Sequence, residues 1–207
     1  MRVLVPFDAT EPKSRLSSVL DAEERRDFAD AMLADVLGAV EAAGHEADVL
    51  ATEPLDLDVP VTVDDRPLTA AVNDVIADAG PPLAVLVADL PLATGAAVSR
   101  LLDRTDPLAL APGRGGGTNG LLVRDGAFRV DFHGASIRDH RQAARAAGLE
   151  PAMVDSFRLA VDVDEPADLA EVLIHGEGRA ADWLRNAGVE LSVTEGRVGV
   201  TRPGGGT

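Results

Sequence analysis

Cysteine is absent from the sequence, and so are long apolar runs. Without cysteine the chain can form no disulfide, no thiolate metal site and no cysteine nucleophile, so a metal would have to be bound through oxygen or histidine. The longest apolar stretches, such as residues 83–88, fall far below the roughly 20 residues that span a bilayer. The first residues form a strand-like run instead of a secretion signal. We therefore expect a cytoplasmic protein that neither crosses a membrane nor is anchored in one.

Basic residues are few, and lysine is nearly absent. Asp and Glu number 35 against 19 Lys and Arg, which gives a net charge of -16, and Lys13 is the single lysine. A broad contact with nucleic acid or an anionic membrane needs clustered positive charge, so we expect neither partner. This composition resembles that of proteins from salt-loaded cytoplasms, where molar salt shortens the screening length to about 3 Å. We therefore expect a halophilic protein, although drift in composition would give the same balance.

The alternation of strand-like and helix-like segments predicts one α/β domain, for which 207 residues suffice. A continuous apolar run at 83–87 is typical of a strand buried on both faces of a parallel sheet, and we place it at the centre. Further strands are predicted at 3–5, 47–51, 59–63, 108–111, 121–123 and 159–163. Helices are predicted at 21–44, 68–79, 94–104 and 136–147, with another beginning at Pro166. This order predicts a three-layer sandwich around a mostly parallel sheet.

Local signals set the ends of several of these elements. Pro6 should stop the first strand, because proline has no N–H to donate. Asp21 and Glu24 have the spacing of a capping box, so the first helix should begin there. Gly44 should end that helix as its C-terminal cap.

The C-terminal segment predicts a hairpin outside the main domain. Val189, Leu191 and Val193 alternate with polar residues, and a turn at 195–196 leads to a second alternating run at 198–200. The apolar face of this hairpin would suit a symmetric homodimer, in which edge strands are covered. The expected divisions of the chain are a main domain (1–187), a hairpin extension (188–203) and a disordered tail (204–207).

Three aspartates follow predicted buried strands and are candidates for a metal site. Asp89 comes after the strand at 83–87, and Asp162 and Asp164 lie at the end of the strand at 159–163. Ligands bind outside the carboxyl ends of the strands in open α/β sheets, and residues two apart in a strand point the same way. Carboxylates suit Mg²⁺, which takes one or two of them and adds water and phosphate. Alternatively, Asp89 caps a helix and the other two form a solvated strand end.

The loop after the first strand carries two candidates for phosphate binding. Lys13 and Arg15 lie at the edge of the predicted sheet where the aspartates also lie. Arginine replaces lysine everywhere else in the chain, so the retention of Lys13 indicates a compact point-charge contact with a phosphate. The other interpretation is that one lysine survived by chance.

Two further loops offer donors to an anion. A glycine-rich loop at 113–120 would let backbone N–H groups approach a phosphate closely, although it could also be only a flexible connection. The junction at 133–136 precedes a helix, whose first N–H groups favour anions. The candidate donors are Gly117, Thr118, Asn119, Gly134 and Ser136. His45, His140 and His175 show no metal-ligand spacing, and we expect them to be ordinary surface or core residues.

Five of these segments, in this order along the chain, resemble the 2-phospho-L-lactate guanylyltransferase family of coenzyme F-420 biosynthesis, in its halophilic archaeal type. The resemblance covers roughly residues 1–187 and leaves out the C-terminal hairpin. Five motifs in order are far more specific than any one of them. The segments are 13–16, 88–92, 115–119, 136–140 and 161–164.

The resemblance implies a nucleotide-diphospho-sugar-transferase-like fold and a Mg²⁺-dependent reaction. GTP and 2-phospho-L-lactate would give lactyl-2-diphospho-5'-guanosine and pyrophosphate. The three aspartates then resemble metal ligands, with Asp89 at the catalytic centre. Lys13 and Arg15 resemble contacts to the triphosphate, and Thr118 and Ser136 resemble contacts to the phosphorylated acid.

Two other functions remain compatible with the sequence. A related nucleotidyltransferase could act on phosphoenolpyruvate, 3-phosphoglycerate or a molybdopterin phosphate, because one small group changes binding by only about 1 to 3 kcal/mol. A non-catalytic nucleotide-binding or scaffolding domain is the alternative from another class. Such a domain would be expected to lack one of the three aspartates, and all three are present.

Overall fold

A seven-stranded sheet with helices on both faces carries the site, and a separate two-stranded hairpin follows it. The computed structural model describes residues 1–194 and 196–203. The strands are β1 (Arg2–Phe7), β2 (Glu46–Ala51), β3 (Val61–Val63), β4 (Leu83–Leu86), β5 (Leu108–Pro112), β6 (Thr118–Val123), β7 (Ala152–Met153), β8 (Glu190–Thr194) and β9 (Arg197–Thr201). The helices are η1 (Ser14–Ser18), α1 (Ala22–Ala42), α2 (Leu68–Ala79), α3 (Gly95–Leu102), α4 (Ser136–Ala146), α5 (Phe157–Ala160), α6 (Asp168–His175) and α7 (Arg179–Asn186).

The large sheet has the strand order β3-β2-β1-β4-β6-β5-β7, so the predicted central strand β4 does lie in the middle. β6 is antiparallel to both of its neighbours, and the other pairs are parallel. Gly120 near the start of β6 pairs with Leu86 at the end of β4. The first residues of β6 therefore lie at the same edge of the sheet as the carboxyl ends of β1 and β4.

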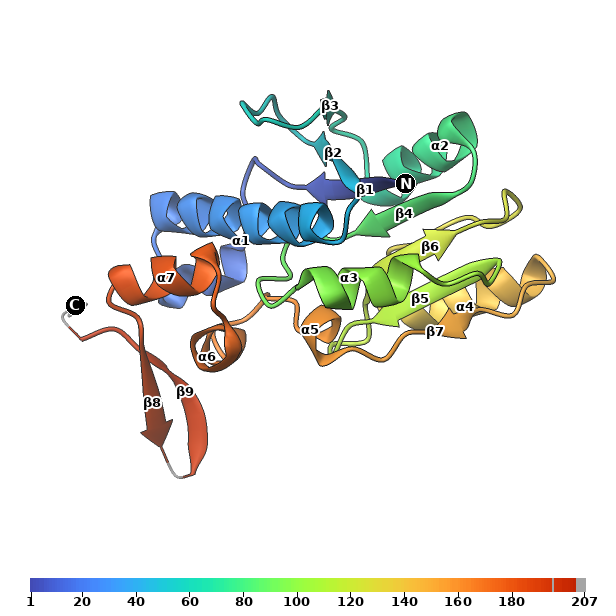
Figure 1. Cartoon of the computed structure of the whole chain (residues 1–207). Coiled ribbons are helices and arrows are strands. Elements are labelled where there is room, and N and C mark those ends of the chain that lie inside the picture. Colours follow the sequence, from blue (N-terminus) through green and yellow to red (C-terminus); the bar gives the residue numbers. More distant parts are fainter. Residues whose placement is uncertain (195, 204–207) are drawn as a thin grey trace.

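Two apolar cores on opposite faces of the sheet confirm the predicted three layers. One core contains buried residues of α1, α3, α6 and α7, and the other contains buried residues of α2 and α4. Figure 1 shows α1 and α3 side by side along one face. The arrangement leaves the loops at the carboxyl edge of the sheet free to form a site.

The first long helix begins and ends as its sequence predicts. The Asp21 carboxylate accepts hydrogen bonds from two backbone amides of the first turn at 2.9 Å, and the Glu24 carboxylate accepts one from the Asp21 amide. Gly44 follows the helix with a φ of +78°, the left-handed conformation that favours glycine. The predicted apolar stripe, Phe28, Met32, Val36 and Val40, is buried.

The predicted strand at 159–163 is wrong. Residues up to Ala160 belong to the short helix α5, because the Ser156 hydroxyl accepts a hydrogen bond from the Leu159 amide and caps that helix. The next residues still alternate, with Val161 and Val163 buried and the aspartates partly exposed, but none of them belongs to a strand. An extended segment with one buried face produces the same sequence pattern as a strand.

Two other predictions about strand ends are also wrong. β1 continues through Pro6 to Phe7, because β4 pairs only with Val3 and Leu4, and beyond them β1 has a partner on one side alone. The glycine-rich loop ends earlier than predicted, since β6 already begins at Thr118. The loop is therefore the connection of the antiparallel β5–β6 pair.

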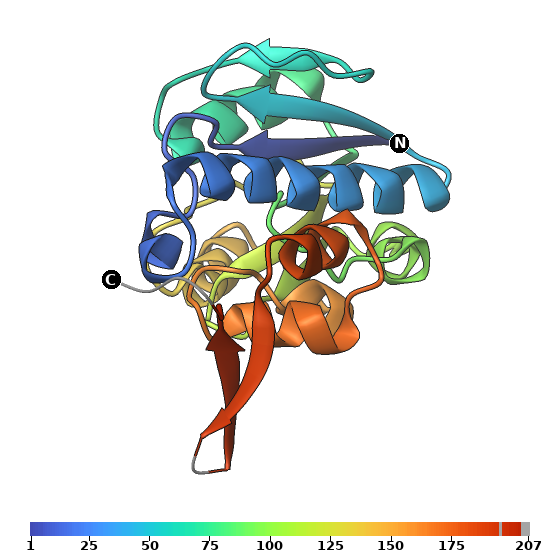
Figure 2. The same ribbon diagram turned by 90° about the vertical axis from the view of Figure 1, so that its left-hand side faces the viewer.

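The C-terminal hairpin is confirmed as β8 and β9, and Figure 2 shows it projecting from the rest of the molecule. Helix α7 and strand β7 were not predicted from the sequence. No helix in the parts of the chain at 1–194 and 196–203 is long and apolar enough to cross a membrane. The expected disordered tail at 204–207 lies outside the described residues, as does Glu195 of the predicted turn. The division into a domain at 1–187 and an extension stays a prediction.

Candidate active site

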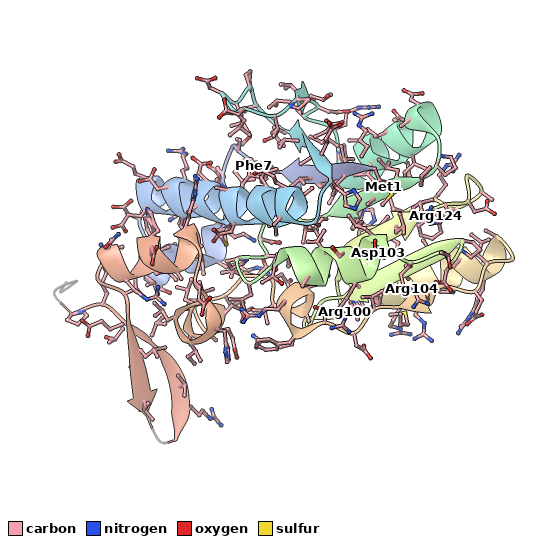
Figure 3. The ribbon with its side chains drawn as sticks, in the orientation of Figure 1. Met1, Phe7, Arg100, Asp103, Arg104 and Arg124 are labelled. Carbon is pink, nitrogen blue, oxygen red and sulfur yellow. The ribbon has the colours of Figure 1, made fainter. Side chains whose placement is uncertain are left out.

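A cavity of about 510 Å³ opens at the carboxyl edge of the sheet. Figure 3 shows Phe7, which lines it, at the end of β1 away from Met1. Residues that follow β1 and β4 line one part of the cavity, among them Lys13, Arg15 and Asp89. Asp164, from the segment after α5, lines the same part beside Lys13. Residues near β2, β3 and α2 line another part, among them Thr52, Asp64, Arg66 and Leu68. We call the part around Lys13, Asp89 and Asp164 the charged part, and Asp64 and Arg66 add charge beside α2.

Lys13 lies between two carboxylates. Its Nζ is 2.5 Å from Asp89 Oδ2 and 3.0 Å from Asp164 Oδ1, and its side chain is only 14% exposed. Burial opposes the charge, but the two carboxylates outweigh it and raise the pKa of Lys13 above its ordinary value. Its φ is 55°, a left-handed conformation that costs a non-glycine residue about 1 to 2 kcal/mol. The two ion pairs help to hold this backbone in place.

Asp89 has one oxygen that the protein does not satisfy. Its Oδ2 accepts from Lys13, whereas its Oδ1 is buried with no hydrogen-bond partner. A buried charged oxygen without a partner is costly, and a bound ion or a catalytic role is among the reasons why a folded protein keeps one. Asp89 is therefore placed as predicted, after the central strand and at the charged part of the cavity.

Asp162 is held in the same cluster by Asn119. The Asn119 side-chain nitrogen lies 3.1 Å from Asp162 Oδ1 and 3.0 Å from the Leu159 carbonyl, so both of its N–H donors are engaged. Burial raises the pKa of Asp162, the Asn119 hydrogen bond acts against this, and the charges of Asp89 and Asp164 add to the rise. The structure thus brings the three aspartates together. A substrate contact by Asn119 stays a prediction.

Arg15 lies at the rim of the cluster. Its guanidinium is 4.0 Å from the Asp164 carboxylate, and 70% of its side chain is exposed. An exposed guanidinium can move toward a phosphate that enters the cavity, at little loss from this long ion pair. Its predicted contact with a triphosphate remains untested by the geometry.

The predicted donors Thr118 and Ser136 lie together on the β6 side of the aspartates. The Thr118 amide donates to the Ser136 hydroxyl at 2.9 Å, and both side chains are buried. Ser136 begins α4, and Gly134 before it has a φ of +51°. Gly117 closes the β5–β6 turn through its carbonyl, which accepts from the Gly113 amide at 2.9 Å. These loops do not line the cavity described above, and their contact with a substrate stays a prediction.

The carboxylates fit a divalent cation that is shared with substrate phosphates. Within the described ranges, no group of three or more His, Asp and Glu side chains could hold a metal ion by itself. The Lys13 ammonium lies where Asp89 and Asp164 face each other, which shows that this space attracts a cation. The unpaired Asp89 Oδ1 is a further hard oxygen donor. Mg²⁺ needs only one or two carboxylates, because water and phosphate complete its coordination.

Two residues matter here that the sequence pattern did not single out. A Cβ on Gly113 would lie 2.4 Å from the Asn119 side-chain oxygen. Gly113, in the predicted phosphate loop, is therefore glycine because the Asn119 side chain packs against it. His140 was expected to lie either on the surface or in the core, and it is buried. Its ring makes two hydrogen bonds, one with the Thr118 hydroxyl and one with the Asp131 amide. Neither contact follows from spacing along the chain.

Comparison with solved structures defines the class of fold. A protein from Desulfovibrio desulfuricans G20, solved as a candidate nucleotide-diphospho-sugar transferase, matches with a TM-score of 0.72 at 16% identity, over 89% of this chain and 94% of that one. A nucleotidyl transferase from Methanothermobacter matches with a TM-score of 0.58 at 15% identity, over 89% of this chain and 98% of that one. The chain therefore has the nucleotide-diphospho-sugar-transferase-like fold.

Sequence comparison narrows this class. The chain matches the family described as guanylyl transferase CofC like over residues 1–202, and it belongs to that family. A curated relative from Halomicrobium mukohataei, named 2-phospho-L-lactate guanylyltransferase, is 63% identical over 203 residues, covering 98% of this chain and 100% of the relative. A relative of the same name from Natronomonas pharaonis is 60% identical over 204 residues, covering 99% and 100%.

Proposed function

We propose that this protein transfers GMP from GTP to 2-phospho-L-lactate, giving lactyl-2-diphospho-5'-guanosine and pyrophosphate, a step of coenzyme F-420 biosynthesis. Its family and the names of its curated relatives support a guanylyltransferase. The observation that carries the proposal is the cluster of Lys13, Asp89 and Asp164, which lines a cavity of about 510 Å³.

The donor nucleotide occupies the cavity in this proposal. A lysine ammonium has three N–H donors, and Lys13 uses two of them on Asp89 and Asp164, so the third is left for a triphosphate oxygen. Arg15 at the rim adds a second positive charge. When bound, Mg²⁺ would offset the negative charge that develops on the triphosphate. The predicted ligands Asp89, Asp162 and Asp164 form no complete metal site in the described residues, so one or two of them would hold it together with phosphate oxygens.

The acceptor lies on the β6 side. A phosphate oxygen of the acid attacks the α-phosphorus of GTP in line, the bond from that phosphorus to the bridging oxygen breaks, and pyrophosphate leaves with the electron pair. A phosphate is already anionic at neutral pH, so the step needs no general base. The chain's task is to orient the two anions and to offset their charge.

A pyrophosphate-release assay tests this function. The purified protein is given Mg²⁺ in molar KCl with GTP or another nucleoside triphosphate, and with 2-phospho-L-lactate, phosphoenolpyruvate or 3-phosphoglycerate. We expect release with GTP and 2-phospho-L-lactate. Release with another acid alone would keep the chemistry and replace the acceptor. No release with any pair, from protein shown to be folded, would favour a non-catalytic nucleotide-binding domain.

We also propose that the hairpin joins two copies of the chain. The cross-strand pair of Val193 and Val198 and the neighbouring Leu191 expose 70%, 50% and 45% of their surface. Val189, predicted on the same face, is buried in its own chain. A dimer mass in size-exclusion chromatography at molar salt, reduced to a monomer by Val193→Arg but not by Ser192→Arg, is expected. A monomer in the wild type would contradict the proposal.

We also propose that the protein needs molar salt for its stability. The net charge of -16 on 207 residues supports it, because dissolved salt reduces the mutual repulsion of the carboxylates.

A further inference from the structure

Buried polar side chains are concentrated in one place. Over the parts of the chain that the structure describes, the buried polar or charged residues are Thr118, Asn119, Ser136 and His140. All of them lie on the first residues of β6 or on α4. Burying a polar group costs free energy unless its hydrogen bonds are made, so a cluster of this kind points to a use.

His140 is held with one ring nitrogen as an acceptor. The Asp131 amide donates to His140 Nε2 at 2.9 Å, and a backbone amide can only donate. Hydrogen bonds on both sides of Asp131 fix the position of this amide. The Asn73 side chain donates to the Val130 carbonyl and accepts from the Val130 amide, and the Thr69 hydroxyl accepts from the Phe132 amide. Nε2 must therefore lack a proton, and the neutral ring carries its proton on Nδ1.

The proton on Nδ1 sets the direction of the next hydrogen bond. His140 Nδ1 lies 2.8 Å from Thr118 Oγ1, so the ring donates and the hydroxyl accepts. Burial lowers the pKa of His140 to about 4, which agrees with a neutral ring. The Thr118 hydroxyl proton is then left to donate elsewhere. Ser136 is in the same state, because its hydroxyl accepts from the Thr118 amide.

We propose that His140 is a positioning residue for the acceptor site, and that it turns the Thr118 hydroxyl into a fixed donor toward an oxyanion of the phosphorylated acid. Carboxylate and ionised phosphate oxygens can only accept, so a hydroxyl oriented in advance as a donor binds them without reorganisation. Phe128 and Phe132 pack against the ring in T-shaped arrangements and keep it from turning. The role assigned to this site rests on the proposed function.

Paired substitutions of His140 separate its two hydrogen bonds. The side-chain nitrogen of His140→Asn can take the place of Nδ1 and still donate to Thr118, whereas His140→Gln reaches toward Asp131 and loses that donor. We expect the glutamine variant to raise the KM for the acid about tenfold and to leave the KM for GTP within about twofold. The asparagine variant should restore most of the acid KM. Equal changes in both KM values would indicate only a structural role and would overturn the proposal.

A double-mutant cycle tests whether His140 acts through Thr118. Thr118→Val should raise the acid KM by a similar factor, and adding His140→Gln to it should cause no further rise. Independent, multiplying effects would contradict the proposal.

NMR of the wild-type protein provides a test that needs no substituted protein, so a variant that fails to fold does not affect it. It also does not require knowing which acid is the true acceptor. Imidazole nitrogen shifts should show the His140 proton on Nδ1, and inorganic phosphate or 2-phospho-L-lactate should shift the Thr118 signals. A proton on Nε2 would overturn the proposal even if the enzyme is active. If the assay of the proposed function shows no turnover while the Nδ1 proton and the phosphate shift are present, the function fails and the positioning role stands.

Discussion

Side chains at this site are held in pairs by hydrogen bonds. Asn119 holds Asp162, and His140 holds Thr118. Lys13 is itself held by carboxylates. Changes in a supporting residue should therefore reduce activity through the side chain that it holds.

Gly113 tests this idea with a matched control. In Gly113→Ala the new methyl group would meet the Asn119 side chain at 2.4 Å, so Asn119 must shift and release Asp162. We expect turnover to fall about tenfold or more, because misplacement of a charged group by a fraction of an ångström weakens catalysis. Gly115→Ala in the same loop meets nothing within 4 Å and should be nearly wild type. Equal rates for both variants would exclude a supporting role for Asn119.

His140 should make stability depend on pH. Its pKa is lowered by burial from 6.5 to about 4, against the opposing charges of Asp131 and Asp139. As the pH falls below 6.5 the unfolded chain binds this proton and the folded chain does not, so folded stability is lost down to about pH 4. The loss from this residue should reach roughly 3 kcal/mol. Denaturant unfolding at several pH values should show a shallower decline in His140→Gln, and identical slopes would contradict a neutral buried ring.

The charged residues were predictable from the sequence, whereas their supports were not. Asp89 and Lys13 follow strands, and the rule that ligands bind at the carboxyl edge of a parallel sheet places both correctly. His140 was expected to be an ordinary surface or core residue, because the histidines show no metal-ligand spacing, and its partners Thr118 and Asp131 come from other segments. A histidine's value to a site depends on tertiary neighbours, which spacing along the chain does not show.

At the scale of whole elements, capping residues and apolar periodicity correctly predicted the helices that they themselves stabilise. Helix α2 has the predicted bounds Leu68–Ala79, and α1 has its capping box. The pattern failed where tertiary contacts decide, since Val161 and Val163 alternate in burial without joining a sheet. Asp162 and Asp164 were thus correctly predicted to lie near Asp89, although the strand from which that prediction was made does not exist.

Helix α7 shows why one element was missed. Its N-terminus has no local side-chain cap, and the Asp35 carboxylate of α1 accepts from the Arg179 and Ala180 amides at 2.7 and 2.9 Å instead. The capping residue is 144 positions away from Arg179 in the sequence, so no local signal marks this helix start.

Asp35 should therefore stabilise the docking of α7 on α1. We expect Asp35→Ala to lower the free energy of unfolding by about 1 to 2 kcal/mol, the usual effect of losing an N-cap. Asp27→Ala, at an exposed position of the same helix, is the control and should change stability little. Denaturant unfolding in molar KCl measures both. A loss no larger than that of the control would show that the distant cap does not stabilise the fold.

Over the whole molecule, acidic residues dominate the charge. The chain has 35 Asp and Glu against 19 Lys and Arg. Several arginines are engaged in ion pairs, including Arg66 with Asp64 and Arg202 with Glu24, but the excess of carboxylates remains. Repulsion among like charges is strongest when salt is dilute.

Stability should consequently rise with salt. We expect the unfolding temperature to increase from dilute buffer to molar KCl by more than about 10 °C, with most of the gain below 1 M, where screening changes fastest. Thermal unfolding followed by circular dichroism measures this. An unfolding temperature that does not depend on KCl would reject the proposed salt requirement.

The most direct test of the account is pyrophosphate release by Asp89→Asn, with GTP, 2-phospho-L-lactate and Mg²⁺ in molar KCl. The substitution keeps the shape of the residue but removes the charge next to Lys13. We expect a loss of at least about a hundredfold, with an unfolding midpoint close to that of the wild type. Asp78→Asn, at an exposed position of α2, should keep full activity. Retained turnover in Asp89→Asn would contradict the assignment of this cluster as the catalytic centre.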